Sequence, residues 1–420
     1  MRAAVIGYGK SGMAAENLLK LEGYSDITVY DDKKEGAKMI AEFTDTYDCV
    51  AVSPGIDLRR MQNAPKKYTS EIELAQKHKP KNAKVIGITG TNGKSTVTTL
   101  TAQILTLAGV ESVACGNIGL TYGECVLAHE YDCYVVELSS FQTGMLHEFM
   151  AECVIVTNLA EDHMDRYRDM DDYADDKMNL IKFIRDGGRL IIEDEAYLVK
   201  KSSFYQGETV KIDPKLENMP KLTGTKLDFG RFYADITEFP LKGGHNIMNL
   251  SYSLLAADAV CGFKGDVTNL VKGLKGLPHR CEFVANIDGV DWINDSKGTN
   301  LHSTLTCLKG FDKGVNVILG GKDKNGDFTV LTDVLNEKAV RVIAYGMAGE
   351  KIENTLKDRL NIPVIRVKDM NEAVDVCRKN AKSGEKVVLS PACASFDLYR
   401  GFEHRGEHFM ELVQALKGGK

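Results

Sequence analysis

No stretch of apolar residues in this 420-residue chain approaches the length that spans a bilayer. The sequence opens directly into an expected strand, which leaves no room for a signal peptide, so we expect a cytoplasmic protein with no membrane insertion. The formal net charge of -6 argues against a nucleic-acid partner held by bulk charge. None of the ten cysteines forms a C-x-x-C pair, so a zinc knuckle or redox motif is not supported and we expect reduced thiols.

The composition is that of an ordinary globular protein, with 43% hydrophobic and 27% charged residues. Strands and helices alternate, which predicts an α/β fold with parallel sheets and ligands at the carboxyl ends of the strands. We expect three domains: a Rossmann-like amino-terminal domain at 1–81, a central domain with a P-loop ATPase-like parallel sheet at 82–277, and a Rossmann-like carboxyl-terminal domain at 278–420.

Short apolar runs mark the strands of these domains. In the first domain we expect strands near Ala3, Ile27 and Val50, and a last helix capped by Ser70. In the second domain, strands at 134–138 and 154–157 are followed by helices. In the third domain we expect strands at 315–319, 342–345, 364–367 and 387–389.

The most informative stretch is Ile88-Thr-Gly-Thr-Asn-Gly-Lys-Ser-Thr96, which lies between an apolar run and a helical pattern. Such a turn aims backbone N–H groups and the positive end of the helix dipole at one point. Lys94 adds a positive charge there, and the Ser95 hydroxyl is suited to hold a Mg2+ that bridges phosphates. The usual phosphate-loop pattern has glycine where this chain has Ile88, so the alternative is a glycine-rich turn that happens to carry a lysine.

A second glycine motif, Gly7-Tyr-Gly-Lys-Ser-Gly12, follows the first expected strand and matches G-x-G-x-x-G in full. The next expected strand ends at Asp31, at the spacing of an acid that binds ribose. Taken alone, this motif indicates a nicotinamide-dependent oxidoreductase. Two nucleotide-type loops in one chain instead suggest two phosphate ligands, such as ATP and a nucleotide-linked substrate.

Polar residues follow the central strands. Glu137 lies at one strand end, where a carboxylate suits Mg2+. His163 lies among acids after the next strand, and Lys177 lies on an expected helix. The alternatives are a capping glutamate, a surface histidine and a lysine on an exposed helix face.

Eight motifs occur in the order found in one family. They are 89–96, Gly116-Asn-Ile-Gly119, Glu137-Leu-Ser-Ser-Phe-Gln142, Glu161-Asp-His-Met-Asp-Arg-Tyr167, His245-Asn-Ile-Met-Asn249, Pro278-His-Arg280, Asn294-Asp-Ser-Lys-Gly-Thr-Asn300 and Ser390-Pro-Ala-Cys-Ala-Ser395. This set resembles the Mur ligases, ATP-dependent amide ligases of peptidoglycan synthesis, and covers all three expected domains. The third and last motifs are similar to those of the branch that joins D-glutamate to UDP-N-acetylmuramoyl-L-alanine.

The resemblance implies that ATP phosphorylates the terminal carboxylate of the UDP-linked substrate, and that the amine of the amino acid then displaces phosphate. It implies two Mg2+ sites, one held by Ser95 and Glu137 and the other by His163 and Lys177. The family's lysine at the Lys177 position is carbamylated, which converts a cation into an anionic oxygen ligand. Lys94, Glu137, His163, Lys177 and Arg280 are the implied catalytic residues.

The remaining ligands are also assigned by resemblance. ATP is expected at Gly90, Asn92, Gly93, Lys94, Ser95, Thr96, Asn246, Asn249, Arg280 and Asp295. The UDP-linked substrate is expected at Lys10, Ser11, Asp31, Lys33, Ser53, Pro54, Gly55, Asn117 and His163. D-Glutamate is expected at Lys297, Thr299, Lys324, Ser395 and Phe402, with Lys324 favoured over Lys322 by position.

Three functions are compatible with parts of this pattern. An NAD-dependent dehydrogenase would give no function to the phosphate loop at 88–96. A phosphate-loop switch without chemistry of its own would give no function to the third domain or to Arg280. A ligase accounts for all of these features, so we expect a monomeric enzyme with small-molecule substrates. We also expect its third domain to close on ATP, with residues 276–278 as the hinge.

Overall fold

The computed structural model describes residues 1–164, 166–241, 243–323 and 325–417. Contacts divide the chain into two compact units, one formed by Met1–Phe239 with Met248–Leu274 and the other by Pro240–Ile247 with Lys275–Lys420. The first unit contains two separate parallel sheets, one on each side of residue 81. Because contacts group both sheets into one unit, the domain boundary expected after residue 81 stays a prediction. No helix within the described ranges combines the length and the apolar character needed to cross a membrane.

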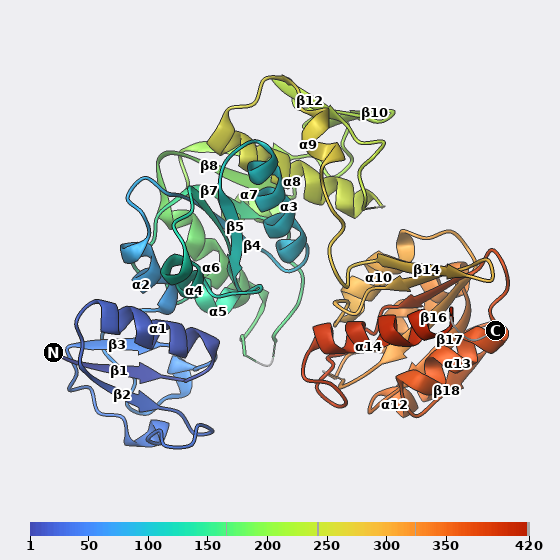
Figure 1. Ribbon diagram of the computed structural model, residues 1–420, viewed down its shortest axis with the longest axis horizontal. Coiled ribbons are helices and arrows are strands. Elements are labelled where there is room, and N and C mark those ends of the chain that lie inside the picture. The colour runs from blue at the N-terminus through green and yellow to red at the C-terminus, as the bar shows by residue number, and fades with distance from the viewer. Residues whose placement is uncertain (165, 242, 324, 418–420) are drawn as a thin grey trace. The chain divides into compact units, whose positions relative to one another are not determined.

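The first unit begins with a three-stranded parallel sheet in the order β2-β1-β3. Its strands are β1 (Arg2–Ile6), β2 (Asp26–Tyr30) and β3 (Cys49–Val52), with α1 (Lys10–Leu21) lying along the sheet (Figure 1). The helix α2 (Glu71–His78) begins as predicted, because the Ser70 hydroxyl accepts from the N–H of Glu73 at 3.3 Å in a capping box.

The central sheet has six parallel strands in the order β5-β6-β4-β7-β8-β9. They are β4 (Lys84–Thr89), β5 (Ser112–Gly116), β6 (Cys133–Glu137), β7 (Ala151–Val156), β8 (Ile184–Glu193) and β9 (Glu208–Ile212). Register places Ile88 beside both Glu137 and Ile155, so the carboxyl ends of β4, β6 and β7 meet at one edge. This edge is where the residues predicted for ATP and Mg2+ in the central domain, such as Lys94 and Glu137, are located.

Helices cover the two sheets of this unit. They are α3 (Lys94–Leu107), α4 (Tyr122–Ala128), α5 (Ser140–Thr143), α6 (Met170–Met178), α7 (Ala196–Lys201), α8 (Gly244–Cys261) and α9 (Thr268–Lys272). One apolar cluster contains both Leu18 of α1 and Val136 of β6, together with Tyr122 of α4. Because one core is shared, the amino-terminal and central sheets form a single compact unit.

The expectation of helices alone after residue 157 is wrong. Besides β8 and β9, the structure has a small sheet of β10 (Lys221–Thr223), β11 (Lys226–Asp228), β12 (Phe232–Asp235) and β13 (Gly265–Asp266). Strands of two to four residues contain too little hydrophobic periodicity to be separated from loops in a sequence.

The second unit is a six-stranded sheet in the order β14-β15-β19-β16-β17-β18, parallel except for the hairpin of β14 and β15. The strands are β14 (Glu282–Ile287), β15 (Val290–Asn294), β16 (Val315–Gly320), β17 (Ala339–Tyr345), β18 (Val364–Arg366) and β19 (Lys386–Leu389). The four strands predicted for this region are confirmed, whereas the hairpin was not predicted.

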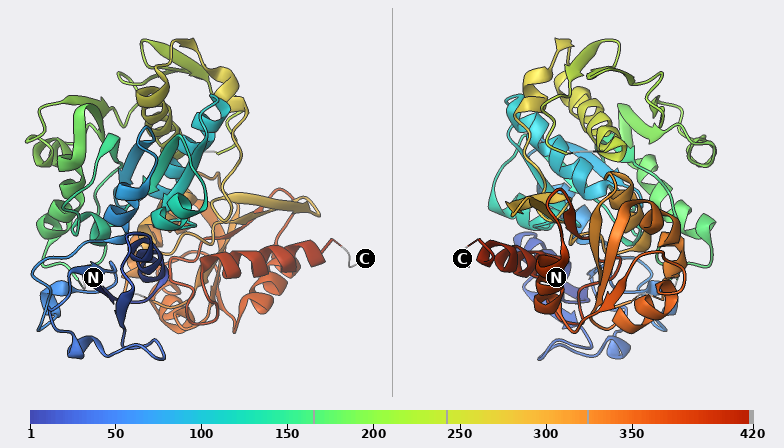
Figure 2. Two further views of the ribbon diagram at one scale, coloured as in Figure 1. Left: turned by 60° about the vertical axis from the view of Figure 1, so that its left-hand side comes forward. Right: turned by 90° about the vertical axis from the view of Figure 1, so that its right-hand side faces the viewer.

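Helices lie on both faces of this sheet, as in doubly wound folds (Figure 2). One apolar cluster joins α10 (Leu301–Lys309), α11 (Thr332–Lys338) and α12 (Gly349–Leu356) to the sheet. A second cluster joins α13 (Met370–Asn380) and α14 (Phe402–Ala415) to the opposite face, where Trp292 and Phe409 are buried.

Candidate active site

The loop between β4 and α3 requires glycine at two positions. Gly90 has φ of +135°, and a Cβ there would collide with the Thr157 hydroxyl. Gly93 has φ of +85°, and a Cβ there would lie 2.6 Å from Oδ1 of Asn249 on α8. The glycines therefore let the loop pass close to the end of β7 and to α8 while its backbone stays available.

Two residues after β7 that were not predicted to have a role, Thr157 and Asn158, hold this loop in place. The Asn158 side chain accepts from the N–H of Asn92 at 2.9 Å, and the Thr157 hydroxyl donates to the Asn92 carbonyl at 2.6 Å. The Asn158 carbonyl accepts from the N–H of Thr91 at 2.9 Å. Their position directly after a central strand is the signal that identifies such residues.

Lys94 and Ser95 open the first turn of α3. The Lys94 ammonium folds back across the loop and donates to the carbonyls of Gly90 and Thr91, each at 2.8 Å. Ser95 is buried, as is Thr96. Because the first N–H groups of a helix have no partner within it, this turn presents donors and a cation to an anion.

Glu137 is the last residue of β6 and is only 2% exposed. Its Oε1 accepts from Nδ2 of Asn117 at 2.9 Å, and its carbonyl accepts from the Asn117 N–H at the same distance. The structure thus brings together the carboxylate predicted for Mg2+ and the asparagine predicted for the UDP-linked substrate.

Lys177 lies on α6 and is 2% exposed, so the alternative of a lysine on an exposed helix face is wrong. Its Nζ donates to the Gly90 carbonyl at 2.7 Å and lies 4.6 Å from the centre of the Tyr173 ring. Burial, and then the charge of Lys94, hold the pKa of Lys177 well below its usual range. The carboxylates of Asp162 and Glu137 act on the same ammonium in the opposite sense.

His163 lies in the loop after β7 with φ of +58°. Its ring centre is 5.0 Å from that of Phe141, and its Nε2 is 3.7 Å from Oδ2 of Asp162. The side chain is 42% exposed, which leaves the imidazole open to a ligand. Asp162 interacts electrostatically with Lys177 as well, so one carboxylate connects the two residues predicted for the second Mg2+.

The amino-terminal glycine motif surrounds the carboxyl end of β1. Gly7 has φ of +84°, and a Cβ on Gly12 would collide with the Gly7 carbonyl. A Cβ on Gly9, by contrast, would meet nothing within 4 Å. The loop is therefore closely packed at its two ends and open in the middle, where a ligand can approach its backbone.

Asp31 shapes this loop from the end of β2. Its carboxylate accepts the N–H groups of Tyr8 at 2.6 Å, Lys33 at 2.8 Å and Lys34 at 3.0 Å. The hydrogen bond from Tyr8, followed by that from Lys33, lowers the pKa of Asp31.

The other residues expected at the UDP-linked substrate surround the same strand ends. The Ser53 hydroxyl donates to the Gly7 carbonyl at 2.6 Å. Lys10, Lys33 and Gly55 are exposed, and Ser11 and Pro54 are half-buried.

Of the asparagines predicted for ATP, Asn246 and Asn249 lie on α8 and are both buried. Asn249 belongs to the first unit, beside the Gly93 turn, whereas Asn246 belongs to the second unit. Tyr252 follows on the same helix, and its hydroxyl donates to the Thr157 carbonyl at 2.7 Å, which ties α8 to the loop region.

In the second unit, Arg280 acts electrostatically on His245: burial, and then the charge of Arg280, lower the pKa of His245. Asp295 is buried at 6% exposure, and its Oδ2 accepts from the Ser390 hydroxyl at 2.7 Å. Burial raises the pKa of Asp295, although the Ser390 hydrogen bond and Arg280 oppose the rise. The carboxylate predicted for the ATP ribose is therefore part of a buried network.

Among the residues predicted for D-glutamate, Lys297 and Phe402 are brought together, with the Lys297 ammonium 4.8 Å from the ring centre. Ser395 is 2% exposed, and the N–H of Thr299 donates to the Lys297 carbonyl at 2.8 Å. Lys324 lies outside the described residues.

Arg405 of α14 was missed by the sequence analysis. Its guanidinium is buried and donates to the Ser296 hydroxyl at 2.9 Å, the Ser296 carbonyl at 2.7 Å and the Cys393 carbonyl at 3.1 Å. It thereby joins the segments that contain Lys297 and Ser395. Its spacing of four residues from Phe409, which is buried on the same face of α14, is the sequence signal for an inward-facing arginine.

Two protein families match most of the chain. The family described as the Mur ligase middle domain matches residues 88–257, which include the phosphate loop, Glu137, His163 and Lys177. The family described as the Mur ligase, glutamate ligase domain, matches residues 279–393, which include Arg280, Asp295 and Lys297.

The chain is 34% identical over 442 residues to the UDP-N-acetylmuramoylalanine--D-glutamate ligase of Solibacter usitatus, covering 99% of this chain and 98% of the relative. It is similar in fold to the crystal structure of a MurF ligase from Thermotoga maritima in complex with ADP, with a TM-score of 0.63, 15% identity and coverage of 99% and 95%. It is also similar to a bifunctional folylpolyglutamate synthase/dihydrofolate synthase with Mn, AMPPNP and L-glutamate bound, with a TM-score of 0.58, 16% identity and coverage of 81% and 91%.

Proposed function

Because this chain belongs to the Mur ligase family, we propose that it joins D-glutamate to UDP-N-acetylmuramoyl-L-alanine with ATP, in the synthesis of a peptidoglycan precursor. The observation that carries the proposal is the pair of lysines at the Gly90 carbonyl, Lys94 at 2.8 Å and Lys177 at 2.7 Å. A second ammonium at this buried carbonyl oxygen would be repelled by that of Lys94, so the site favours an uncharged or anionic Lys177 and anionic ligands beside Lys94.

ATP supplies these anions. The N–H groups at the start of α3 and the Lys94 ammonium would hold its β- and γ-phosphates. The γ-phosphoryl group passes to the terminal carboxylate of the UDP-linked substrate, which gives an acyl phosphate and ADP. The amine of D-glutamate then attacks the acyl carbon, and inorganic phosphate leaves as the amide bond forms. Arg280 of the second unit is proposed to stabilise the charge of the transferring phosphoryl group.

The residues at the edge of the central sheet fit divalent magnesium. Mg2+ prefers oxygen ligands, and the Glu137 carboxylate and Ser95 hydroxyl are both buried oxygens at the ends of neighbouring elements. These two residues would hold one ion, and His163 with a modified Lys177 would hold a second. Bound Mg2+ would neutralise phosphate charge during transfer.

Lys177 is suited to carbamylation because its lowered pKa favours the neutral amine. The Nζ lone pair attacks CO2, a nitrogen–carbon bond forms, and one proton leaves to solvent. The product is an anion whose oxygens could ligate Mg2+, where the ammonium would be repelled by it. The negative charge of the carbamate would also be attracted to the Lys94 ammonium, whereas an unmodified Lys177 ammonium would be repelled by it.

The open middle of the Gly7–Gly12 loop is proposed to receive the UDP moiety, with Lys10, Ser11 and Lys33 near its phosphates and Asp31 fixing the loop. Ser53, Pro54 and Gly55 would line the same strand ends, and Asn117 would meet the sugar and peptide end.

D-Glutamate is proposed to bind the second unit through Lys297, Thr299, Ser395 and Phe402, since a cation and hydroxyls suit a dicarboxylate. Asp295 and Asn246 are proposed to contact ATP, and the enzyme is expected to act as a cytoplasmic monomer.

An ADP-release assay tests this function. The purified chain with MgATP should form ADP only when UDP-N-acetylmuramoyl-L-alanine and D-glutamate are both present. L-Glutamate, L-alanine, L-lysine and meso-diaminopimelate serve as alternative amino acids. Equal turnover with any of them would refute the assignment of D-glutamate. Displacement of the UDP-linked substrate by micromolar NADH would instead favour a dinucleotide site at the Gly7–Gly12 loop.

A further inference from the structure

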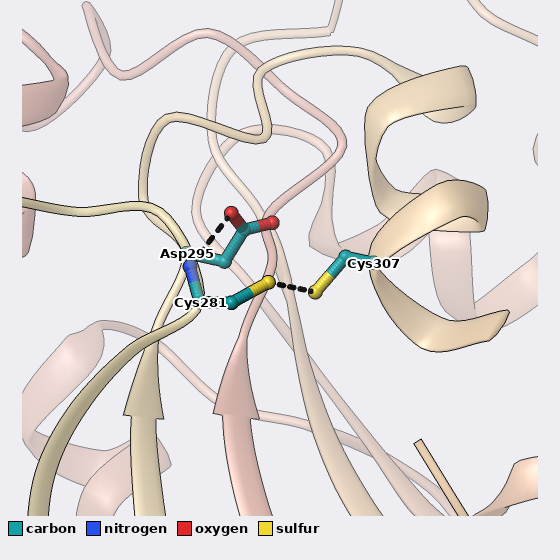
Figure 3. A group of neighbouring side chains, drawn as sticks. All are labelled: Cys281, Asp295 and Cys307. Carbon is teal, nitrogen blue, oxygen red and sulfur yellow. Dashed lines mark hydrogen bonds between the residues drawn. The ribbon is translucent and has the colours of Figure 1, made fainter. Parts of the chain in front are cut away.

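Within the described part of the chain, three potential metal ligands converge in the second unit, whereas the oxygen ligands proposed for Mg2+ belong to the first unit. They are Cys281 before β14, Asp295 after β15 and Cys307 on α10, and their ligand atoms all lie within 4.8 Å of one another (Figure 3). They are separated in sequence by 14 and 12 residues and follow no zinc-binding spacing, so only the fold reveals them.

Contacts hold these side chains facing one another. The sulfur atoms of Cys281 and Cys307 are 3.2 Å apart, and Asp295 Oδ1 accepts from the Cys281 N–H at 3.3 Å. The Ser390 hydroxyl donates to the other carboxylate oxygen at 2.7 Å. An orienting hydrogen bond to a ligating carboxylate is the usual supporting contact of a metal site.

The cluster has a buried floor and an accessible side. Cys307 is 4% exposed and Asp295 is 6% exposed, whereas Cys281 is half-buried. A bound cation would stabilise the thiolate forms of both cysteines and the carboxylate form of Asp295.

We propose that Cys281, Asp295 and Cys307 bind a thiophilic divalent cation such as zinc, with three protein ligands and one open position. On binding, both thiols lose their protons to solvent and two metal–sulfur bonds form alongside one metal–oxygen bond. Soft thiolate ligands favour zinc or cadmium over Mg2+, so the site would not compete for the magnesium of the reaction.

The sulfur spacing favours a metal over a disulfide. Two thiolates on a tetrahedral zinc, with bonds of about 2.3 Å, lie about 3.8 Å apart, so the observed pair must separate by roughly half an ångström. A disulfide of about 2.05 Å would require the sulfurs to approach by more than about 1 Å, with a buried Cys307 as one partner.

Resting on the proposed function, the site has a consequence for catalysis. A bound ion would engage Asp295, the carboxylate proposed for ATP, and would fix Cys281 next to Arg280. Zinc is therefore expected to inhibit the ligase, and removal of a cysteine should relieve that inhibition without removing a residue of the reaction.

Equilibrium dialysis of the full reduced chain against zinc alone or cadmium alone, without ATP or substrates, tests the site independently of the ligase. We expect one ion per chain, with an ultraviolet cadmium–thiolate absorption band. Cys281→Ser and Cys307→Ala should each weaken binding at least about tenfold, since each removes one of three ligands. The matched control is Cys261→Ala, at the end of α8 in the first unit, which should bind as the unaltered chain does.

Thermal melts establish that each variant is folded, and Cys281→Ser decides the matter if the buried Cys307→Ala variant does not fold. Absence of metal from the unaltered chain, unchanged affinity in the folded cysteine variants, or loss of two thiols to a disulfide without metal would each overturn the proposal. In the ADP-release assay, zinc should inhibit the unaltered chain and not Cys281→Ser; equal inhibition of both would contradict the competition with ATP.

Discussion

The two glycine loops of the first unit each connect a parallel strand to a helix, and they have different electrostatic surroundings. The Gly90–Gly93 loop has the ammonium groups of Lys94 and Lys177 at its own carbonyls. The Gly7–Gly12 loop instead packs against Asp31, which accepts the N–H of Tyr8. A glycine pattern thus predicts a backbone that a ligand can approach, whereas the neighbouring charges indicate which ligand it receives.

Both loops contain closely packed glycines, but only the amino-terminal loop has an open middle position. A Cβ at Gly90 or Gly93 would meet Thr157 or Asn249, whereas a Cβ at Gly9 would meet nothing within 4 Å. The central loop is therefore closely enclosed by neighbouring elements, which favours the alignment that phosphoryl transfer requires. The amino-terminal loop needs only to bind a substrate whose reacting atoms lie elsewhere.

Replacing Lys177 by Ala should have the largest effect, because it removes both the proposed metal ligand and the buried amine of the central loop. Turnover is expected to fall at least about a thousandfold, the upper range for one electrostatic stabiliser. A short carboxylic acid should restore part of the ADP release by supplying oxygen ligands. Lys182→Ala, at an exposed lysine nearby, is the matched control. Near-normal turnover in the folded Lys177→Ala variant would contradict the carbamate proposal.

Lys94→Met and Lys10→Met compare the loops directly. The first change removes a cation from the phosphoryl-transfer site and should lower kcat/KM for ATP about a hundredfold. The second removes an exposed cation and should raise KM for the UDP-linked substrate less than about tenfold, as expected for a screened surface charge. Steady-state ADP-release kinetics measure both. A greater loss in Lys10→Met than in Lys94→Met would reverse the assignment of the two loops.

Gly90→Ala and Gly9→Ala test the packing difference. At Gly90, a positive φ and the collision with Thr157 should together lower the free energy of unfolding by about 2–4 kcal/mol. At Gly9, where φ is -81°, alanine should change it by less than about 1 kcal/mol. Urea unfolding measures both variants. Similar stabilities would show that Thr157 and the loop adjust to a methyl group, and that the central loop is not rigid.

Much of this arrangement could be predicted from local sequence. Both glycine loops, the Ser70 cap and the parallel strands produce signals within a few residues, because they depend on backbone geometry and short apolar runs. The positions of Glu137 and His163 followed from the rule that ligands bind at the carboxyl ends of parallel strands.

Long-range contacts could not be predicted in this way. Arg405 donates hydrogen bonds to Ser296, which lies more than 100 residues earlier in the chain, and to Cys393. The convergence of Cys281 with Cys307 depends on how the segment before β14 packs against α10. The burial of Lys177 likewise depends on a distant segment, because its ammonium contacts the Gly90 carbonyl of the loop after β4. The sequence of α6 alone does not show this contact.

Glu71 provides the smallest and most specific test, because it lies where α2 meets α4 and helps join the regions that carry the two loops. Its carboxylate accepts from the Gly123 N–H, and burial raises its pKa from 4.5 to about 7. The folded state therefore binds more protons than the unfolded state between these values, so stability falls as pH rises through this window. Glu71→Gln removes the ionisation and keeps an oxygen for Gly123.

The Glu71→Gln variant should match the unaltered chain near pH 4.5 and be more stable by at most about 3 kcal/mol at pH 8, from 1.36 kcal/mol per pKa unit. Urea unfolding at the two pH values measures the difference, with the exposed Glu130→Gln as control. A pH-independent difference would show that Glu71 does not titrate in the core. A gain at pH 8 within a single transition would show that the regions carrying the two glycine loops unfold as one cooperative unit.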